Sequence, residues 1–284
     1  MTAATPVEVV FLCLARDCAA TLPGFLAFTR ALAASGTTNL AIIGENGSRD
    51  ATRQIIAAAA GRGGVQLADT SNLAAIPNRY LRLAAGREQL KQLLDMSDLE
   101  PRFVCVADVD AVMVEPPSAA DFNAALRLLD SRDDVFAAGA TSRPLFYDIL
   151  AYEDDQLSYA DLPRRTNAAR QNLLTYHRFV ADNVYSELQR ISARGQTTCV
   201  SSFNGMCVYK YEMYKAGSYV ANHADDICEH LTLNRAVAAA SRRSMIVTPL
   251  MTLTTPPEHM PAGPIRFWWI RTRRAIWAML PARS

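Results

Sequence analysis

The first 115 residues alternate between short apolar runs and longer segments with helical periodicity, and this alternation constrains the fold more than any other feature of the chain. The apolar runs are rich in β-branched residues, as is typical of buried strands. We expect strands over residues 7–14, 39–43, 65–68 and 103–107. We expect helices over residues 21–34, 50–61 and 78–94. Such alternation predicts an α/β fold, in which a mostly parallel central sheet has helices on both faces.

The second half of the chain is less regular. One or two helices are expected over residues 167–195, with further helices over 121–130 and 226–240 and strands over 135–140 and 245–253. The length suits one large domain with an appendage. We therefore predict a single domain over residues 1–263, divided into halves 1–115 and 116–263, and a carboxyl-terminal extension over 264–284.

Composition and charge exclude several classes of protein. The formal net charge is +1 over 284 residues, which gives no general reason to expect a nucleic-acid partner. Six cysteines are scattered without a C-x-x-C pair, which indicates reduced thiols. The amino terminus lacks the basic start and apolar core of a signal peptide, and no segment has the ~18–20 apolar residues of a membrane span. We therefore expect a cytoplasmic protein that does not span a membrane.

Two aspartates lie inside the otherwise apolar run V-C-V-A-D-V-D-A-V-M-V, residues 104–114. Asp108 and Asp110 are two residues apart, so they would share one face of an extended chain. Burying two like charges is costly unless something neutralises them. At the carboxyl end of a strand, such a pair could hold Mg²⁺ or Mn²⁺ and leave coordination positions for phosphate oxygens. The alternative is a solvated loop, because D-x-D alone is a common pattern.

Two further segments offer groups that suit a nucleotide. The second expected strand ends in the turn I-I-G-E-N-G-S-R-D, from which Glu45 and Asn46 could bond a nucleobase or a ribose. On the helix expected before the D-x-D strand, Arg79, Arg82 and Arg87 have near-helical spacing, and guanidinium groups bind diphosphate well. The alternatives are an ordinary turn and arginines on an exposed helical face.

Together these motifs resemble the GT-A family of nucleotide-sugar glycosyltransferases, whose Rossmann-like sheet ends in a D-x-D metal motif. Two further segments point to a particular subfamily: S-S-F-N-G-M-C-V-Y-K (201–210) and D-D-I-C-E-H-L-T-L-N (225–234). With A-A-G-R-E and D-V-D, they are similar to the fungal capsule-associated α-1,3-mannosyltransferases. The resemblance covers roughly residues 7–255. We expect a protein that is shorter than those proteins and has no amino-terminal membrane anchor of their kind.

The resemblance implies a metal-dependent glycosyltransferase that moves a sugar from a nucleotide donor to a saccharide or lipid-linked acceptor. The first half of the domain would bind the donor and the second half the acceptor. Mn²⁺ or Mg²⁺ would lie across from Asp108 and Asp110 and bridge to the diphosphate of a GDP- or UDP-sugar. The fungal likeness implies GDP-mannose as the donor and retention of the anomeric configuration.

The resemblance also implies residues for each part of the site. The donor-binding residues would be Leu14, Ala15, Arg16, Glu45, Asn46, Arg79, Arg82, Arg87, Asp108 and Val109. The acceptor pocket would form around Phe203, Asn204 and Gly205. Asp226 and Glu229 would be the catalytic carboxylates, either as a general base or as groups that orient a substrate. The further metal ligand would be His259 or His230.

Two other functions remain as alternatives. A sugar-1-phosphate nucleotidyltransferase shares the strand–helix start, but it would need a Gly-rich basic loop after the first strand. The chain has L-A-R-D-C-A-A-T-L-P-G at that place, which weakens this alternative. A non-catalytic peripheral membrane module is the second alternative, and the intact D-V-D, F-N-G and C-E-H segments argue against it.

The carboxyl-terminal extension has a composition of its own. Residues 264–284 contain all three tryptophans and five arginines but no acidic residue. An apolar stripe at helical spacing is formed by Ile265, Trp268, Trp269, Ile276, Met279 and Leu280. A basic amphipathic helix of this kind suits the interface of an anionic membrane. The alternative is that the stripe docks on the protein's own core or on a second copy.

Overall fold

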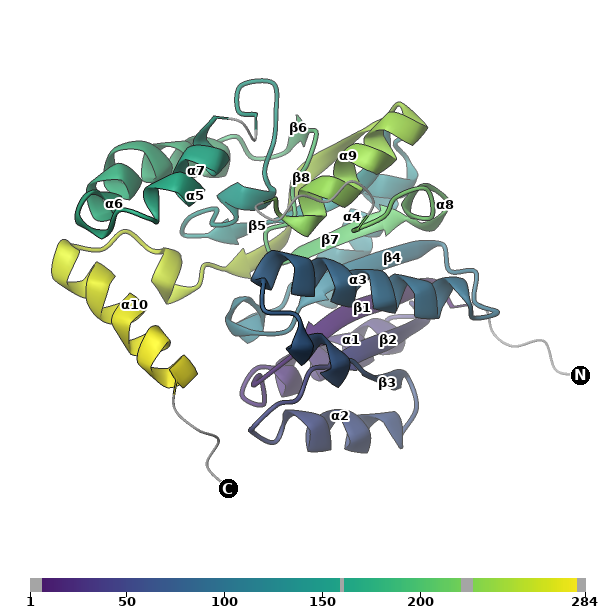
Figure 1. The fold of residues 1–284 in the computed structure, drawn as a ribbon. Helices are drawn as coiled ribbons and strands as arrows, with labels where there is room; N and C mark the ends of the chain where they lie inside the picture. The colour runs from purple at the N-terminus through teal and green to yellow at the C-terminus, as the bar shows by residue number, and fades with distance from the viewer. Residues whose placement is uncertain (1–6, 159–160, 221–226, 280–284) are drawn as a thin grey trace, which may run out of the picture.

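The computed structural model describes residues 7–158, 161–220 and 227–279 (Figure 1). Within these residues one eight-stranded sheet has the order β3–β2–β1–β4–β7–β5–β8–β6. The strands are β1 (Val9–Ala15), β2 (Asn39–Glu45), β3 (Val65–Asp69), β4 (Phe103–Asp108), β5 (Val135–Arg143), β6 (Thr197–Cys199), β7 (Met206–Lys210) and β8 (Ser244–Thr254). Neighbours from β3 to β4 are parallel, as are β5 and β8, whereas β7 and β6 pair antiparallel.

Helices cover both faces of this sheet, and the alternation of side chains along β1 shows why. Val9, Phe11 and Cys13 face the core formed with α1, α2 and α4, whereas Val10 and Leu12 face the core formed with α3 and α9. The helices are α1 (Leu22–Ala34), α2 (Thr52–Ala60), α3 (Arg79–Asp95), α4 (Ala119–Asp130), α5 (Leu162–Ala169), α6 (Leu173–Phe179), α7 (Tyr185–Ala193), α8 (Tyr211–Tyr214), α9 (Glu229–Ser241) and α10 (Pro264–Met279). The predicted α/β class with helices on both faces is confirmed.

The second half of the chain departs from the sequence expectations in two places. β7 lies antiparallel between β4 and β5, where Val208 is the partner of both Cys105 and Ala138. Its residues are apolar on both faces, so it can occupy the middle of the sheet. The segment expected as one or two helices forms α5, α6 and α7, with a π-helical turn η4 (Val180–Val184) joining the last two.

Four short 3₁₀ segments complete the described fold: η1 (Ser71–Ala75), η2 (Ala111–Val114), η3 (Ile149–Ala151) and η5 (Pro257–His259). From η5 the chain enters α10, which Figure 1 shows beside the α5–α7 group and away from the sheet. None of the helices in the described ranges combines the length and the apolar character that crossing a membrane requires.

Candidate active site

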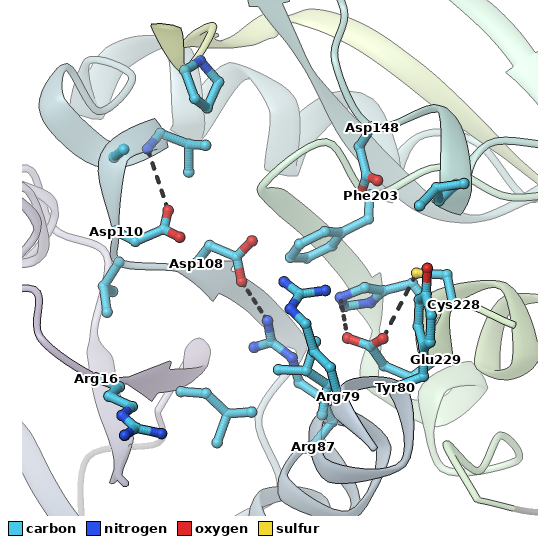
Figure 2. A pocket seen from close by; sticks show the side chains of 18 of the residues that line it. Arg16, Arg79, Tyr80, Arg87, Asp108, Asp110, Asp148, Phe203, Cys228 and Glu229 are labelled. Carbon is cyan, nitrogen blue, oxygen red and sulfur yellow. Dashed lines mark hydrogen bonds and ion pairs between the residues drawn. The ribbon is translucent and has the colours of Figure 1, made fainter. Parts of the chain in front are cut away.

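A cavity of about 630 Å³ opens where β1 and β4 end (Figure 2). The start of α3, the segment before η3, the start of α9 and η5 complete its wall. Opposite charges face one another across it. The arginines are Arg16, Arg79, Arg82, Arg87 and Arg170, and the acids are Asp108, Asp110, Asp148, Glu229 and Glu258. Such a lining suits a ligand that carries both negative charge and hydroxyl groups.

Asp108 ends β4, and its carboxylate meets the guanidinium of Arg87 on α3. Nη2 of Arg87 donates to Oδ1 of Asp108 at 2.5 Å, and the two side chains are 3% and 31% exposed. Burial alone would lower the pKa of Arg87, but the carboxylates of Asp108 and Glu229 outweigh it and raise that pKa, so the guanidinium is charged. Its Nε and Nη1 have no hydrogen-bond partner in the described structure. A buried cation with unused donors is suited to an anionic ligand.

Asp110 follows two residues later and starts η2. Its Oδ1 accepts a hydrogen bond from the N–H of Val112 at 3.3 Å, and its side chain is exposed. Figure 2 shows the carboxylates of Asp108 and Asp110 pointing into the same space. Their oxygens are ligands that Mg²⁺ and Mn²⁺ prefer. In the described ranges no three or more His, Cys, Asp or Glu side chains form a group that could hold a metal ion, so phosphate or water oxygens would have to complete a coordination shell around this pair.

His230 lines the cavity from α9 and is 2% exposed. Its ring stacks on Phe203 with 3.5 Å between the ring centres. Burial and the positive charge of Arg87 hold the pKa of His230 well below its usual range, so the imidazole is neutral. Neither ring nitrogen has a hydrogen-bond partner among the described residues, although Nε2 lies 3.5 Å from Oε1 of Glu229. A neutral imidazole in this state can bond a substrate hydroxyl.

The other candidate histidine lies at the opposite part of the wall. His259 ends η5 and lines the cavity, with its ring centre 5.0 Å from that of Tyr147. Within the described residues the structure brings neither His259 nor His230 together with both aspartates as a metal-binding group.

Glu229 is the first residue of α9, and its side chain is 4% exposed. The thiol of Cys228 donates to its Oε2 at 3.7 Å. Burial raises the pKa of Glu229, and the nearby charge of Arg87 offsets this only in part. Glu229 is therefore a buried carboxyl at the cavity wall that can exchange a proton or accept a hydrogen bond. Its predicted companion, Asp226, lies outside the described residues.

Asn204 and Gly205 do not line the cavity, but they contact the loop of Tyr147 and Asp148, which does. Oδ1 of Asn204 accepts the N–H of Tyr147 at 3.0 Å and the N–H of Asp148 at 3.3 Å, so its side chain holds the neighbouring loop. Gly205 has a φ of 87°, and a Cβ there would lie 2.8 Å from the hydroxyl oxygen of Tyr147, so only glycine fits without a shift. Of the three predicted acceptor residues, Phe203 alone lines the cavity.

The predicted donor residues divide in a similar way. The residues that line the cavity are Leu14, Ala15, Arg16, Asn46, Arg79, Arg82, Arg87, Asp108 and Val109. Glu45 does not, because its buried carboxylate accepts the N–H of Ser48 at 2.5 Å and Nη1 of Arg53 at 2.8 Å. It holds the turn between β2 and α2 and does not project toward a ligand. Oδ1 of Asn46 is buried and has no hydrogen-bond partner among the residues that the structure describes, so it can accept a hydrogen bond from a ligand.

The arginines of α3 differ in whether their guanidinium groups already have hydrogen-bond or ion-pair partners in the protein. Nη1 of Arg82 donates to the carbonyl of Ile76 at 2.9 Å. Arg79 makes no hydrogen bond or ion pair with any described residue, and Figure 2 shows it between Asp108 and Glu229. Its exposed guanidinium is thus available to a ligand in the cavity.

Asp148 is a cavity residue that the sequence motifs did not single out. Burial, together with the negative charges of Asp108 and Glu229, raises its pKa to about 7, against the opposing effect of Arg79. Figure 2 shows its carboxyl turned toward the cavity. One charge in the apolar stretch L-F-Y-D-I-L (145–150) is the same kind of signal as the D-V-D pair, and it could have been noticed.

Comparisons with known proteins give weak similarities. No protein-family model and no curated protein matches the chain. Solved structures of glucosyl-3-phosphoglycerate synthase from Mycobacterium tuberculosis are similar over 95% of this chain and 76–77% of their own. A complex with Mn²⁺, UDP and glucosyl-3-phosphoglycerate has a TM-score of 0.47 at 14% identity, and one with Mn²⁺, UDP and phosphoglyceric acid has 0.48 at 12%. At this level the site has to be understood from the chain's own residues.

Proposed function

We propose that the protein is a metal-dependent glycosyltransferase, which moves a sugar from a nucleoside diphosphate donor to a hydroxyl-bearing acceptor. One observation carries the proposal. Asp108 and Asp110 extend from the end of a parallel strand into a cavity that also holds the buried, partly unsatisfied guanidinium of Arg87. Ligands of α/β sheets bind at this edge of the sheet, and the combination of carboxylates and arginine suits a metal-bound diphosphate.

The two aspartates would hold the cation, Mn²⁺ or Mg²⁺, together with oxygens of the ligand. When bound, it would neutralise the charge that develops on the diphosphate as the anomeric C–O bond breaks. We infer no metal role for His230, because its ring is buried and stacked on Phe203 and does not group with the two aspartates among the described residues. His259 at the rim stays the candidate for a further ligand.

Different residues of the chain would bind the diphosphate, the base or ribose, and the sugar. Arg79, Arg82 and Arg87 would bind the diphosphate oxygens, and Asn46 would bond the base or ribose. Phe203 and His230 would form the floor under the sugar, because a stacked pair gives an apolar face beside two unused ring nitrogens.

The acceptor hydroxyl would be bound by Asp148 or Glu229. Glu229 is buried and Asp148 is partly buried, and the pKa of each carboxyl is raised, to about 7 for Asp148, so both are suited to accept a hydroxyl proton. Asp226 stays a candidate for the same role. GDP-mannose with retention is the donor and outcome suggested by the fungal resemblance, and a UDP-sugar is the alternative. A cytoplasmic location, with the carboxyl-terminal helix on a membrane surface, fits a lipid-linked acceptor.

The deciding experiment is a thermal-shift panel of UDP-, GDP-, CMP- and dTDP-sugars, each with and without Mn²⁺. A ligand at one hundred times its Kd stabilises the native state by ~2.7 kcal/mol, or about 5 °C for a chain of this size. We expect such a shift with one nucleotide only, and only with metal.

Product analysis then separates the competing functions. Release of nucleoside diphosphate from the active donor supports glycosyl transfer, whereas pyrophosphate formation from a nucleoside triphosphate and a sugar phosphate would identify a nucleotidyltransferase. If no sugar nucleotide shifts the melting temperature, the proposal fails.

A further inference from the structure

Among its described side chains, α10 packs on the rest of the molecule chiefly through the side that carries Phe267. Phe267 is 1% exposed, and its ring centre lies 4.8 Å from that of His177 and 5.6 Å from that of Tyr176 on α6. The guanidinium of Arg271 covers the same ring at 3.4 Å from its centre. Phe267 and Arg271 are four residues apart and so lie on one side of the helix. This inner side attaches α10 to the body of the protein.

The outer side of α10 carries large apolar side chains in solvent. Ile265 is 87% exposed and Trp269 is 65% exposed, and these residues are also four apart. Together with Gly263, Pro264 and Arg266 they surround a hollow of about 490 Å³. An exposed indole next to an exposed isoleucine is unusual for a surface that faces only water.

Positive charge flanks this apolar pair. Arg266 and Arg273 are exposed, and neither makes an ion pair or hydrogen bond with a described residue. The whole extension, residues 264–284, has five arginines and no acid. The outer side of α10 therefore combines apolar anchors with cations that have no counter-charge on their own helix.

We propose that this outer side docks α10 on an anionic membrane surface. Ile265 and Trp269 enter the interface between headgroups and acyl chains, and Arg266 and Arg273 contact lipid phosphates. Charge complementarity selects the membrane over a second copy of the chain, because two copies joined through this side would bring two arginine-bearing helices together with no acid between them. The docking does not depend on the identity of the donor or on the reaction.

The position of α10 gives the docking a further consequence, which rests on the proposed function. Pro256, Glu258 and His259 line the cavity, and α10 starts five residues after His259. A helix held on the membrane keeps this part of the cavity rim near the lipid surface. The arrangement suits an acceptor hydroxyl carried on a lipid.

The test is co-sedimentation of the full chain with phosphatidylcholine vesicles, with and without phosphatidylglycerol. The native protein should bind the anionic vesicles and not the neutral ones. Ile265→Ser with Trp269→Ser should weaken this binding roughly tenfold or more, and Arg266→Gln with Arg273→Gln by about fivefold per arginine. Met96→Ser is the matched control, because Met96 is 85% exposed on another surface, and it should bind like the native protein.

Two further measurements, tryptophan fluorescence and the nucleotide-induced thermal shift, complete the test. All three tryptophans lie in the extension, so its entry into the bilayer should shift tryptophan emission to the blue, and less so without Trp269. Equal binding of the Ile265/Trp269 variant, or equal binding to neutral vesicles, would overturn the proposal. A native dimer that this variant dissociates would instead assign the surface to a second copy. The nucleotide-induced thermal shift should be unchanged in every α10 variant, so a failed donor assay and a failed docking assay remain distinct.

Discussion

Arg87 and Asp108 form an ion pair in the wall of the cavity, with 2.5 Å between Nη2 and Oδ1. The guanidinium carbon also lies 5.4 Å from the ring centre of Phe203, so the cation is fixed on two sides. The positive charge of Arg87 offsets the cost of placing Asp108 at the end of the apolar strand β4, two residues before Asp110. In the proposed function, Asp108 would therefore contact both the Arg87 guanidinium and a bound metal ion.

Replacing Arg87 by Met should destabilise the protein and make its stability depend on metal. The change leaves Asp108 without its counter-charge, at a cost of about 2–3 kcal/mol because part of that carboxylate is exposed to water. Mn²⁺ should restore more stability to the variant than to the native protein, measured by chemical denaturation with and without the ion. Arg82→Met is the control, since Arg82 donates to a backbone carbonyl and forms no ion pair with a described carboxylate. Equal responses of both variants to Mn²⁺ would contradict a shared role at Asp108.

Asp110→Asn should weaken Mn²⁺-dependent donor binding at least tenfold while it leaves the melting temperature within about 1 °C. The side chain is exposed, and its hydrogen bond with the N–H of Val112 is long, so we expect the fold to tolerate the loss of its charge. Titration calorimetry with nucleoside diphosphate in the presence of Mn²⁺ measures the effect. Asp133→Asn, at another exposed aspartate, is the matched control. Unchanged affinity in Asp110→Asn would remove the metal site from this strand end.

His230→Phe should preserve the stack on Phe203 and remove two unsatisfied buried nitrogens. We therefore expect a melting temperature equal to or above that of the native protein. Transfer activity should fall roughly tenfold or more, because a hydrogen bond to a substrate hydroxyl is lost. Mn²⁺ affinity should stay unchanged, and its loss would show that His230 is a metal ligand after all.

Asp148→Asn should change the pH dependence of stability in a defined direction. The pKa of Asp148 rises from 3.8 to about 7 in the folded protein, chiefly through burial. Between these values the folded state binds the proton more tightly than the unfolded state, so native stability falls as pH rises, and the full cost is present above about pH 7. At pH 8 the variant should therefore melt about 2–4 °C above the native protein. At pH 4 the two proteins should have the same melting temperature.

These melting curves should be recorded in EDTA, so that no cation near Asp108 alters the field at Asp148. Asp155→Asn, at an exposed aspartate, should show no such divergence with pH. A constant difference between Asp148→Asn and the native protein across the pH range would mean that the carboxyl is not perturbed by its surroundings.

Much of the first half could be predicted from local pattern. The strands at Val9–Ala15, Asn39–Glu45 and Phe103–Asp108 are within two or three residues of the expected runs, because each is apolar, β-branched and bounded by a turn. The position of β7 between β4 and β5 could not be predicted in the same way. Strand order depends on how distant segments pair, and the local pattern of Met206–Lys210 is compatible with several places in a sheet.

The site residues show the same division. Asp108 and Arg87 stand out as charges in otherwise apolar or helical surroundings, so their presence at a site was predictable, but their mutual contact was not. Glu45 looked like a ligand-binding residue because it follows a strand, yet Ser48 and Arg53 engage both of its oxygens. Asp148 was overlooked because it lies in irregular structure, and its position depends on the loop held by Asn204.

The backbone N–H of Asp108 donates to the carbonyl of Gly205 at 2.9 Å, so the end of β4 and the turn at Gly205 are mechanically linked. A donor that draws Asp108 toward itself would carry the Gly205 turn along, and the neighbouring Phe203 with it. Acceptor affinity should then depend on whether the donor has already bound. Steady-state kinetics would show a compulsory order, in which the nucleotide binds first and leaves last.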